Sequence, residues 1–348
     1  MKIFYNTIVC LLIVSISFSQ NNNKAEKDTL KEKTVKLEKV IVLGDPKTDP
    51  IHSVVSNKYE DKVVQPKNVA DLFNGINGFS VIKRGNYAND PSFRASQYEQ
   101  LNIQYDGGTK AMHACPNRMD PITTHIIPEE ISKIEIVKGP FTVRYGANFG
   151  GIINLVTHTP DESDYGLHGK VSGGYETNGS SYVSMVQLQK ATEKYDIAGN
   201  FGYRDFGNYE DGNSIEIPSS FRSTDYGLKA GLNISKNQRL QAHWRQSFGR
   251  DVKHAGLPMD TDFDNSSILS VDYKLDNIGE KVKYLSAKAY YSYVDHLMTN
   301  TNRPSFMMTD AASNVEATTF GGKIELKWQP STTLQVYSGL DLINISRD

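Results

Sequence analysis

From residue 165 to the end, the sequence is a succession of strand-forming runs in which apolar and polar side chains alternate. Residues two positions apart in a β-strand lie on the same face, so each run predicts a strand with one apolar and one polar face. The expected strands are 166–177, 181–190, 195–204, 225–235, 238–248, 267–276, 281–298, 317–328 and 333–345. A chain with this pattern forms an antiparallel sheet, either in a soluble sandwich or in the wall of a barrel.

The connections between these expected strands alternate in length after the first hairpin. The short connections are 191–194, 236–238, 277–280 and 329–332, and the long ones are 205–224, 249–266 and 299–316. Outer-membrane barrels alternate short periplasmic turns with long outer loops, whereas a soluble sandwich has no such alternation. The pattern therefore favours a transmembrane barrel, with the sandwich as the alternative.

The first 19 residues have the parts of a secretory signal peptide. Lys2 precedes an apolar core from Ile8 to Phe18, and small residues stand before Gln20. The apolar run is shorter than the about 20 residues that a membrane-spanning helix needs. We therefore expect Sec-type export, with residues 20–37 as a polar, disordered lead-in.

A short segment in the middle of the chain gathers soft metal ligands. Cys115 stands close to Met112, His113 and Met119. The other cysteine, Cys10, lies in the expected signal, so Cys115 is expected to be the only thiol of the exported chain. Thiol and thioether sulfur suit Cu(I) better than hard ions. The formal net charge of −2 gives no support for nucleic-acid binding.

Residues 51–160 predict a compact segment that mixes short helices and strands. Helical spacing is expected over 68–75, and Pro128 begins a second short helix. The expected strands are 79–82, 101–105, 134–137 and 152–156.

Several stretches of this segment, taken in order, resemble the plug of TonB-dependent outer-membrane receptors. They are 68–73 with 77–79, 101–107, 134–140 with 144–146, and 150–157. The resemblance implies an α+β plug domain over 51–160, followed over 165–348 by the first part of an antiparallel transmembrane β-barrel in outer-membrane lipid. It also implies a transporter rather than an enzyme. Plugged barrels of this type use about 22 strands, so we expect the sequence to be the N-terminal part of a longer protein.

The family resemblance also assigns a role to a strand-forming peptide before the plug. Such a peptide could add to a sheet edge of a partner, or it could be the first strand of the next domain. By the resemblance it looks like the TonB box, which a TonB-type energy-coupling complex binds in the periplasm. Its residues are Glu38, Lys39, Val40, Ile41, Val42, Leu43 and Gly44.

Within that family, the stretch from Cys115 to Met119 resembles the Cys-x-x-x-Met motif of copper receptors of the OprC/NosA type. In those receptors a His-x-Met from the barrel wall joins the plug motif, and this chain has His296-Leu297-Met298. The resemblance implies copper, with Cu(I) favoured, as the transported ligand. The implied metal ligands are Cys115, Met119, His296 and Met298, with Met112 and His113 as secondary candidates.

The alternation of polar and apolar residues along the seventh expected strand indicates whether His296 and Met298 can face the motif from Cys115 to Met119. Its even positions include Ser286, Lys288 and Ser292, whereas its odd positions are mostly apolar. His296 and Met298 share the even face, which we expect to look into the lumen toward the plug.

Three other functions stay open at this point. The main alternative is a TonB-dependent receptor for a siderophore or another metal complex. An exported enzyme could use Cys115 as a nucleophile with His113 as its base, although no third orienting residue is evident. A surface adhesin is the third. We interpret a further set of residues as structural or ordinary loop residues: His125, Glu135, Lys138, Arg144, Tyr145, His254, Met259, Met307 and Met308.

Overall fold

The computed structural model describes residues 52–56, 64–160 and 165–348. All of them lie in one compact unit, Val42–Asp348. The predicted signal peptide, the polar lead-in and the TonB-box candidate lie outside the described residues. Across the described part of the chain, no helix combines the length and the apolar character needed to cross a membrane.

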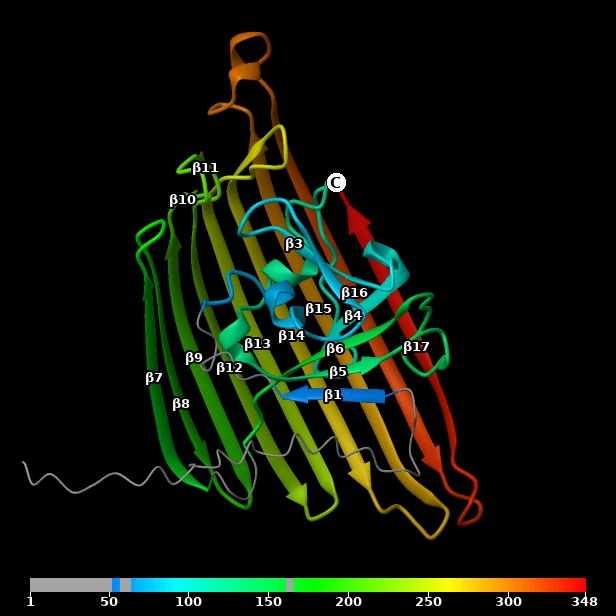
Figure 1. Cartoon of the computed structure of the whole chain (residues 1–348). Helices are drawn as coiled ribbons and strands as arrows, with labels where there is room; N and C mark the ends of the chain where they lie inside the picture. The colour runs from blue at the N-terminus through cyan, green and yellow to red at the C-terminus, as the bar shows by residue number, and fades with distance from the viewer. Residues whose placement is uncertain (1–51, 57–63, 161–164) are drawn as a thin grey trace, which may run out of the picture. The chain divides into compact units, whose positions relative to one another are not determined.

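The C-terminal part of this unit is a nine-stranded antiparallel sheet in which strands that follow one another also pair (Figure 1). Each of the nine expected strands is present. Their bounds are β7 (Gly166–Glu176), β8 (Ser181–Ala191), β9 (Tyr195–Phe206), β12 (Phe221–Ser235), β13 (Gln238–Val252), β14 (Asp260–Asp276), β15 (Val282–Thr299), β16 (Ala312–Trp328) and β17 (Val336–Arg347). The connection after β9 carries a small hairpin of β10 (Tyr209–Glu210) and β11 (Glu216–Ile217), and the one after β15 carries the 3₁₀ helix η7 (Pro304–Met307).

All three long connections are shorter than predicted, since those expected over 205–224 and 299–316 cover 207–220 and 300–311. The one expected over 249–266 covers only 253–259, because β13 runs on to Val252 and β14 begins at Asp260. The start of β14 is polar except for Phe263, so it lacked the alternation that marks a strand. The turn expected over 329–332 extends to 335, since β17 begins at Val336. The alternation of loop lengths is therefore weaker than predicted.

The sheet has an apolar outer face. One row of directly paired residues crosses five strands and consists of Leu228, Trp244, Leu269, Tyr291 and Phe320. Each side chain in this row keeps at least 38% of its surface exposed. An exposed apolar band of this kind suits contact with lipid.

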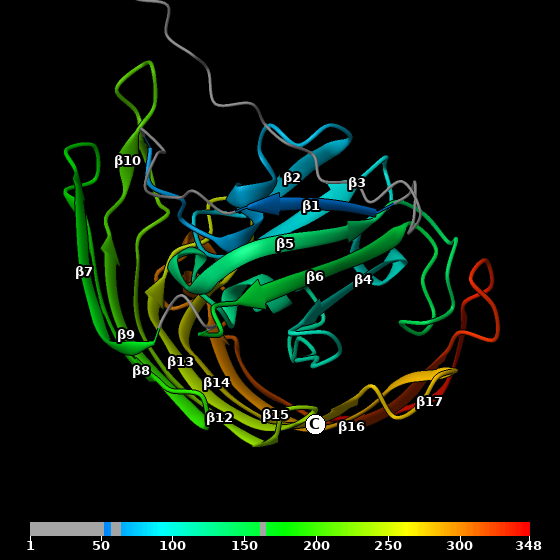
Figure 2. The same cartoon turned by 90° about the horizontal axis from the view of Figure 1, so that it is seen from below.

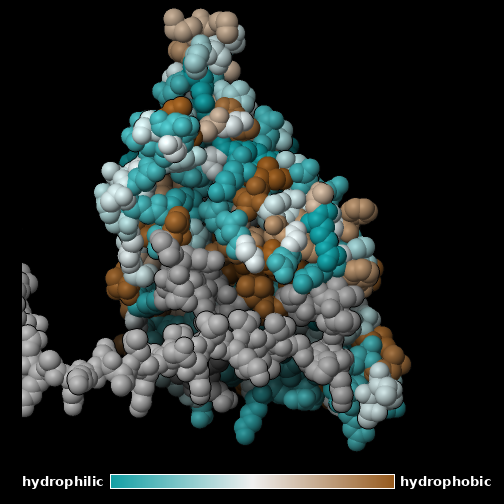
Figure 3. All heavy atoms as spheres, in the orientation of Figure 1, coloured by the Kyte–Doolittle hydropathy of each residue, from teal (hydrophilic) through white to brown (hydrophobic). Residues whose placement is uncertain are grey.

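The plug packs against the concave face of the sheet, which curves around it (Figure 2). It contains a four-stranded sheet in the order β1-β5-β6-β4 and a separate β2–β3 hairpin. The strands are β1 (His52–Ser56), β2 (Phe79–Lys83), β3 (Asn89–Phe93), β4 (Leu101–Tyr105), β5 (Ile131–Val137) and β6 (Gly151–Thr157). The helical segments are single 3₁₀ turns: η2 (Val69–Phe73), η3 (Tyr98–Gln100), η4 (Ile122–Thr124) and η5 (Pro128–Glu130). Seen from the open side of the sheet, the plug is mostly hydrophilic, with smaller hydrophobic patches (Figure 3).

The plug has its own hydrophobic core. Phe73 from η2 packs with Ile134 and Ile136 of β5 and with Ile153 and Leu155 of β6, and none of these five side chains is more than 1% exposed. The Asn68 side chain accepts a hydrogen bond from the Ala70 N–H and so caps η2, as expected for Asn at this position. Burial of these large side chains stabilises the plug sheet, and Ile268 of β14 belongs to the same cluster, so this core also contacts the nine-stranded sheet.

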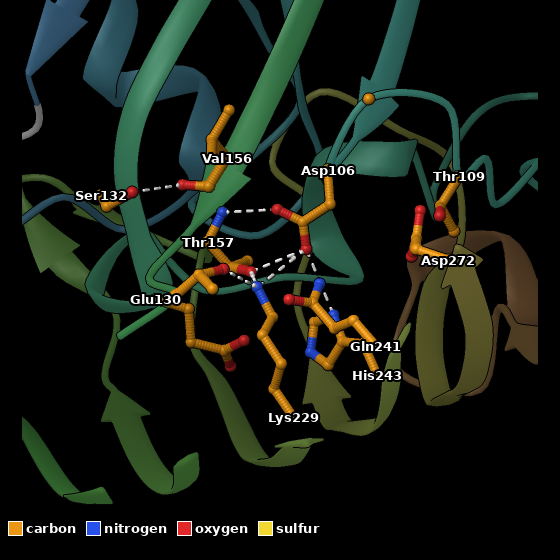
Figure 4. A network of polar contacts seen from close by, with 12 residues as sticks. Asp106, Thr109, Glu130, Ser132, Val156, Thr157, Lys229, Gln241, His243 and Asp272 are labelled. Carbon is orange, nitrogen blue, oxygen red and sulfur yellow. Dashed lines mark hydrogen bonds and ion pairs between the residues drawn. The ribbon is translucent and has the colours of Figure 1, made fainter. Parts of the chain in front are cut away.

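A buried ionic network joins the plug to the nine-stranded sheet, which is called the wall below (Figure 4). Lys229 of β12 extends its ammonium group to 3.3 Å from Asp106, which follows β4, and also donates to Thr157 and Thr159. His243 of β13 lies 3.3 Å from the same carboxylate. Burial alone would raise the pKa of Asp106, but Lys229 and His243 outweigh it and hold this pKa well below its ordinary value.

A second buried ion pair joins η5 to β13, where a Glu130 oxygen lies 3.3 Å from Arg245. Burial raises the pKa of Glu130 to about 7, against the opposing charge of Arg245. The folded-state pKa therefore lies above the unfolded value of about 4.3. Protonation of the Glu130 carboxyl therefore stabilises the folded state fully below about pH 4, and this stabilisation is lost as pH rises through 7.

We therefore expect Glu130→Gln to raise the free energy of unfolding at pH 8 by about 1–2 kcal/mol and to leave it unchanged near pH 4. Urea unfolding of the detergent-solubilised protein at both pH values measures this difference. A variant that is less stable than the wild type at pH 8 would show that the ion pair with Arg245 outweighs the cost of burial.

Candidate metal centre

The loop that carries the sulfur motif is a tight turn. The Arg118 N–H donates to the Cys115 carbonyl over 2.9 Å, and Arg118 has a φ of 55°, in the left-handed region. The Asp120 carboxylate accepts hydrogen bonds from the backbone N–H groups of Ala114 (2.5 Å) and Cys115 (2.9 Å). Asp120 thus closes the turn and brings Cys115 and Met119 to one side of it.

The same turn is anchored to the plug hairpin. The Arg118 guanidinium donates to both oxygens of Asp90 in β3, over 2.8 and 3.2 Å. Asp90 also accepts from Arg84 over 2.8 Å, and only 1% of its side chain is exposed. Paired N–H donors from one guanidinium fix orientation as well as distance. The sulfur-bearing turn is therefore held rigidly on the plug.

The sulfur-bearing turn of the plug contacts the wall through two sulfur atoms. The Cys115 thiol lies 3.5 Å from the Met298 sulfur of β15, and Met119 packs in the same cluster. These three side chains are 0%, 4% and 1% exposed, respectively. Leu257, Met259 and Val315 cover the cluster. The arrangement is a buried cluster of soft donors.

His296 completes the group from the wall. The potential ligand atoms of Cys115, Asp120 and His296 all lie within 4.8 Å of one another, and all three residues are buried. The alternation in β15 correctly predicted the inward face, because Ser292, His296 and Met298 are buried whereas Tyr291 is exposed. The structure thus brings the four predicted ligands to one place.

Asp120 is the group that sequence reasoning missed at this site. Its only local signal is a carboxylate immediately after Met119, and that signal is common on protein surfaces. Burial raises the pKa of Asp120 to about 7, with Asp264 adding to the effect while His296 and two backbone N–H groups oppose it. The site therefore contains an oxygen donor as well as its sulfur and nitrogen donors.

The two secondary candidates lie differently. The His113 ring faces Arg118 at 3.2 Å and Glu99 at 3.8 Å, and burial followed by the Arg118 charge lowers its pKa to about 4. Met112 is half-buried, and the sulfur cluster forms without it. Of the loop residues set aside earlier, Met307 and Met308 are 89% and 84% exposed.

Two further histidines lie buried near the site. His125 is 1% exposed and His254 is fully buried, and burial lowers their pKa values to about 4 and about 3. His254 shares the Thr261 hydroxyl with His296, over 3.0 and 3.4 Å. Neutral imidazoles of this kind add no positive charge near the cluster of potential metal ligands.

Comparison with known proteins places the plug in a family. Residues 47–152 match the model of the TonB-dependent receptor plug domain. A hemin receptor of Yersinia enterocolitica is 22% identical over 278 residues, which cover 74% of this chain and 38% of that protein. The chain thus spans well under two thirds of this relative.

Solved structures share the fold of the described chain. The copper transporter OprC has a TM-score of 0.78 at 24% identity, covering 86% of this chain and 46% of its own. The hemophore receptor HasR of Serratia marcescens, in complex with its hemophore and heme, has a TM-score of 0.72 at 21% identity, covering 86% and 45%. The TonB-dependent receptors are transporters and receptors, not enzymes. The chain therefore contains a plug domain of the TonB-dependent receptor family, and its described part shares the fold of OprC.

Proposed function

We propose that the receptor imports copper across the outer membrane and binds it as Cu(I) between Cys115 and Met119 of the plug and His296 and Met298 of the wall. The observation that carries the proposal is the contact of the Cys115 and Met298 sulfur atoms across the plug–wall boundary, at 3.5 Å between buried side chains. Soft sulfur donors with one imidazole suit Cu(I). Zn²⁺ favours cysteine, histidine and carboxylate, which Cys115, His296 and Asp120 also offer, so the preference for Cu(I) rests on the two thioethers.

The position of the site suggests how binding is linked to transport. Two ligands come from the plug and two from β15, so copper bridges parts that move relative to each other when the plug is displaced. We infer that bound copper shifts the plug and makes the segment 38–44 available to a TonB-type partner. Pulling on the plug would then separate the two halves of the site and release the ion.

The proposal predicts selective binding by the wild-type receptor. Receptor purified from outer membranes should bind one Cu(I), or the Cu(I) probe Ag(I), more tightly than Zn²⁺ or hemin. Met298→Leu conserves volume but removes one thioether, and it should weaken Cu(I) binding by about tenfold or more. The matched control is Met185→Leu on β8, a buried methionine outside the sulfur cluster, which should bind copper like the wild type.

The same measurement addresses the alternative cargo that the relatives suggest. A hemin or siderophore receptor would retain its ligand after Met298→Leu and would bind Cu(I) no better than Zn²⁺. That combination of results would contradict the copper proposal, but it would not affect the match of the plug to its family. The four histidines around the site, His113, His125, His254 and His296, are at most 8% exposed, which favours a bare ion over a porphyrin.

A further inference from the structure

Asp264 lies beside the wall half of the metal site because of strand register. It is the direct partner of His296 across the β14–β15 ladder, and Thr261 is the partner of Met298. An Asp264 oxygen lies 3.5 Å from His296 Nδ1. Both side chains are at most 1% exposed. A buried carboxylate opposite an imidazole needs a reason, because burial of a charged group is costly.

The plug holds the same carboxylate from the other side. The Tyr87 hydroxyl donates to Asp264 Oδ2 over 2.8 Å, and the Thr124 hydroxyl donates to it over 3.3 Å. Tyr87 is itself fixed, because its carbonyl accepts from Asn68 over 2.6 Å and its ring packs on Phe221. Asp264 is thus a wall residue whose position depends on the plug.

The Asp264 carboxylate lies beside Nδ1 of His296. With Nδ1 directed at Asp264, Nε2 is the nitrogen left to bind the metal, and the Thr261 hydroxyl lies 3.4 Å from it. An acceptor on one imidazole nitrogen fixes the tautomer and the ring orientation and raises the basicity of the other nitrogen. Neither Asp264 Oδ1 nor His296 Nδ1 has a hydrogen-bond partner among the described residues, so the two atoms lie 3.5 Å apart with only each other to compensate their burial.

We propose that Asp264 is a positioning residue for copper binding, and that Tyr87 of the plug sets where its carboxylate lies. The inference rests on the proposed copper function. The wall half of the site is then fully ordered only while the plug is seated. A plug movement that withdraws Tyr87 loosens His296 and lowers the affinity for copper at the moment of release.

The test compares Asp264→Asn and Tyr87→Phe with the wild-type receptor purified from outer membranes. Cu(I) affinity is measured by competition with a chromogenic chelator, and the ligand set by copper X-ray absorption. Asp264→Asn should weaken binding by about 10–100-fold and diminish imidazole scattering while the sulfur scattering stays. Tyr87→Phe should act in the same direction but less, since it removes one hydroxyl.

The matched control is Asp272→Asn, on the same strand, where the carboxylate pairs with Lys288 instead. It should stay within about twofold of wild-type affinity. Unchanged affinity and imidazole scattering in Asp264→Asn would overturn the inference, as would the joint loss of sulfur and imidazole scattering. Copper retained by both Cys115→Ala and His296→Ala would instead refute the proposed function itself.

Discussion

Replacing Cys115 with alanine should lower Cu(I) affinity more than any other single substitution at the site. The thiolate is the only anionic sulfur among the predicted ligands, and it lies 3.5 Å from Met298. Loss of a partner outside the ligand set costs about 10–100-fold in metal affinity, so loss of this ligand should cost more than about 100-fold. Copper content per receptor after gel filtration, together with chelator competition, measures the effect.

The fold should survive this change, because Cys115→Ala removes one atom from a small cluster and costs about 1 kcal/mol. An unchanged urea midpoint and unchanged protease resistance of the plug check this point. The matched control is Met112→Leu, in the same loop but outside the sulfur cluster, which should bind copper normally. Full copper occupancy in Cys115→Ala would exclude a thiolate-centred site.

Many of the wall strands could be predicted because the alternation of apolar and polar residues along a strand can be read from the local sequence. A strand with one face toward lipid and one toward the plug must alternate, and residues 282–299 show this in the sequence and in the burial of β15. The start of β14 escaped prediction because polar residues occupy both of its faces. β3 escaped because Asn89, Asp90 and Pro91 are typical of turns. The proline is tolerated there since β3 pairs only with β2.

The candidate site was predictable only in part. Cys115 and Met119 stand out as sulfur in a short loop, and the alternation of β15 places His296 and Met298 on the inner face. That the two halves touch depends on the placement of the plug against the wall across 183 residues of sequence, which no local pattern contains. Asp264 came to light only through the β14–β15 register, because isolated aspartates carry no signal of their own.

The largest stability effect is expected from Lys229→Met in the plug–wall network. The substitution keeps the apolar stem of the side chain but leaves the buried Asp106 carboxylate with only His243 and Thr157 as polar partners from this network. Removing one member of a buried ion pair costs about 3–5 kcal/mol, because the remaining charge is unpaired. Urea unfolding of the detergent-solubilised receptor should report a loss of this size at pH 7.

Two further variants and a change of pH separate this cause from a general packing defect. Lys274→Met removes a surface ammonium paired with Asp276, where the side chains are 53% and 40% exposed, and should cost at most about 1 kcal/mol. Adding Asp106→Asn to Lys229→Met should restore much of the lost stability. The folded-state pKa of Asp106 is depressed, so its contribution is present above the unfolded value of about 3.9 and fades as pH falls below it. The difference in the free energy of unfolding between Lys229→Met and the wild type should therefore become smaller at pH 3. Equal losses of stability in Lys229→Met and Lys274→Met would contradict a stabilising buried ion pair between the plug and the wall.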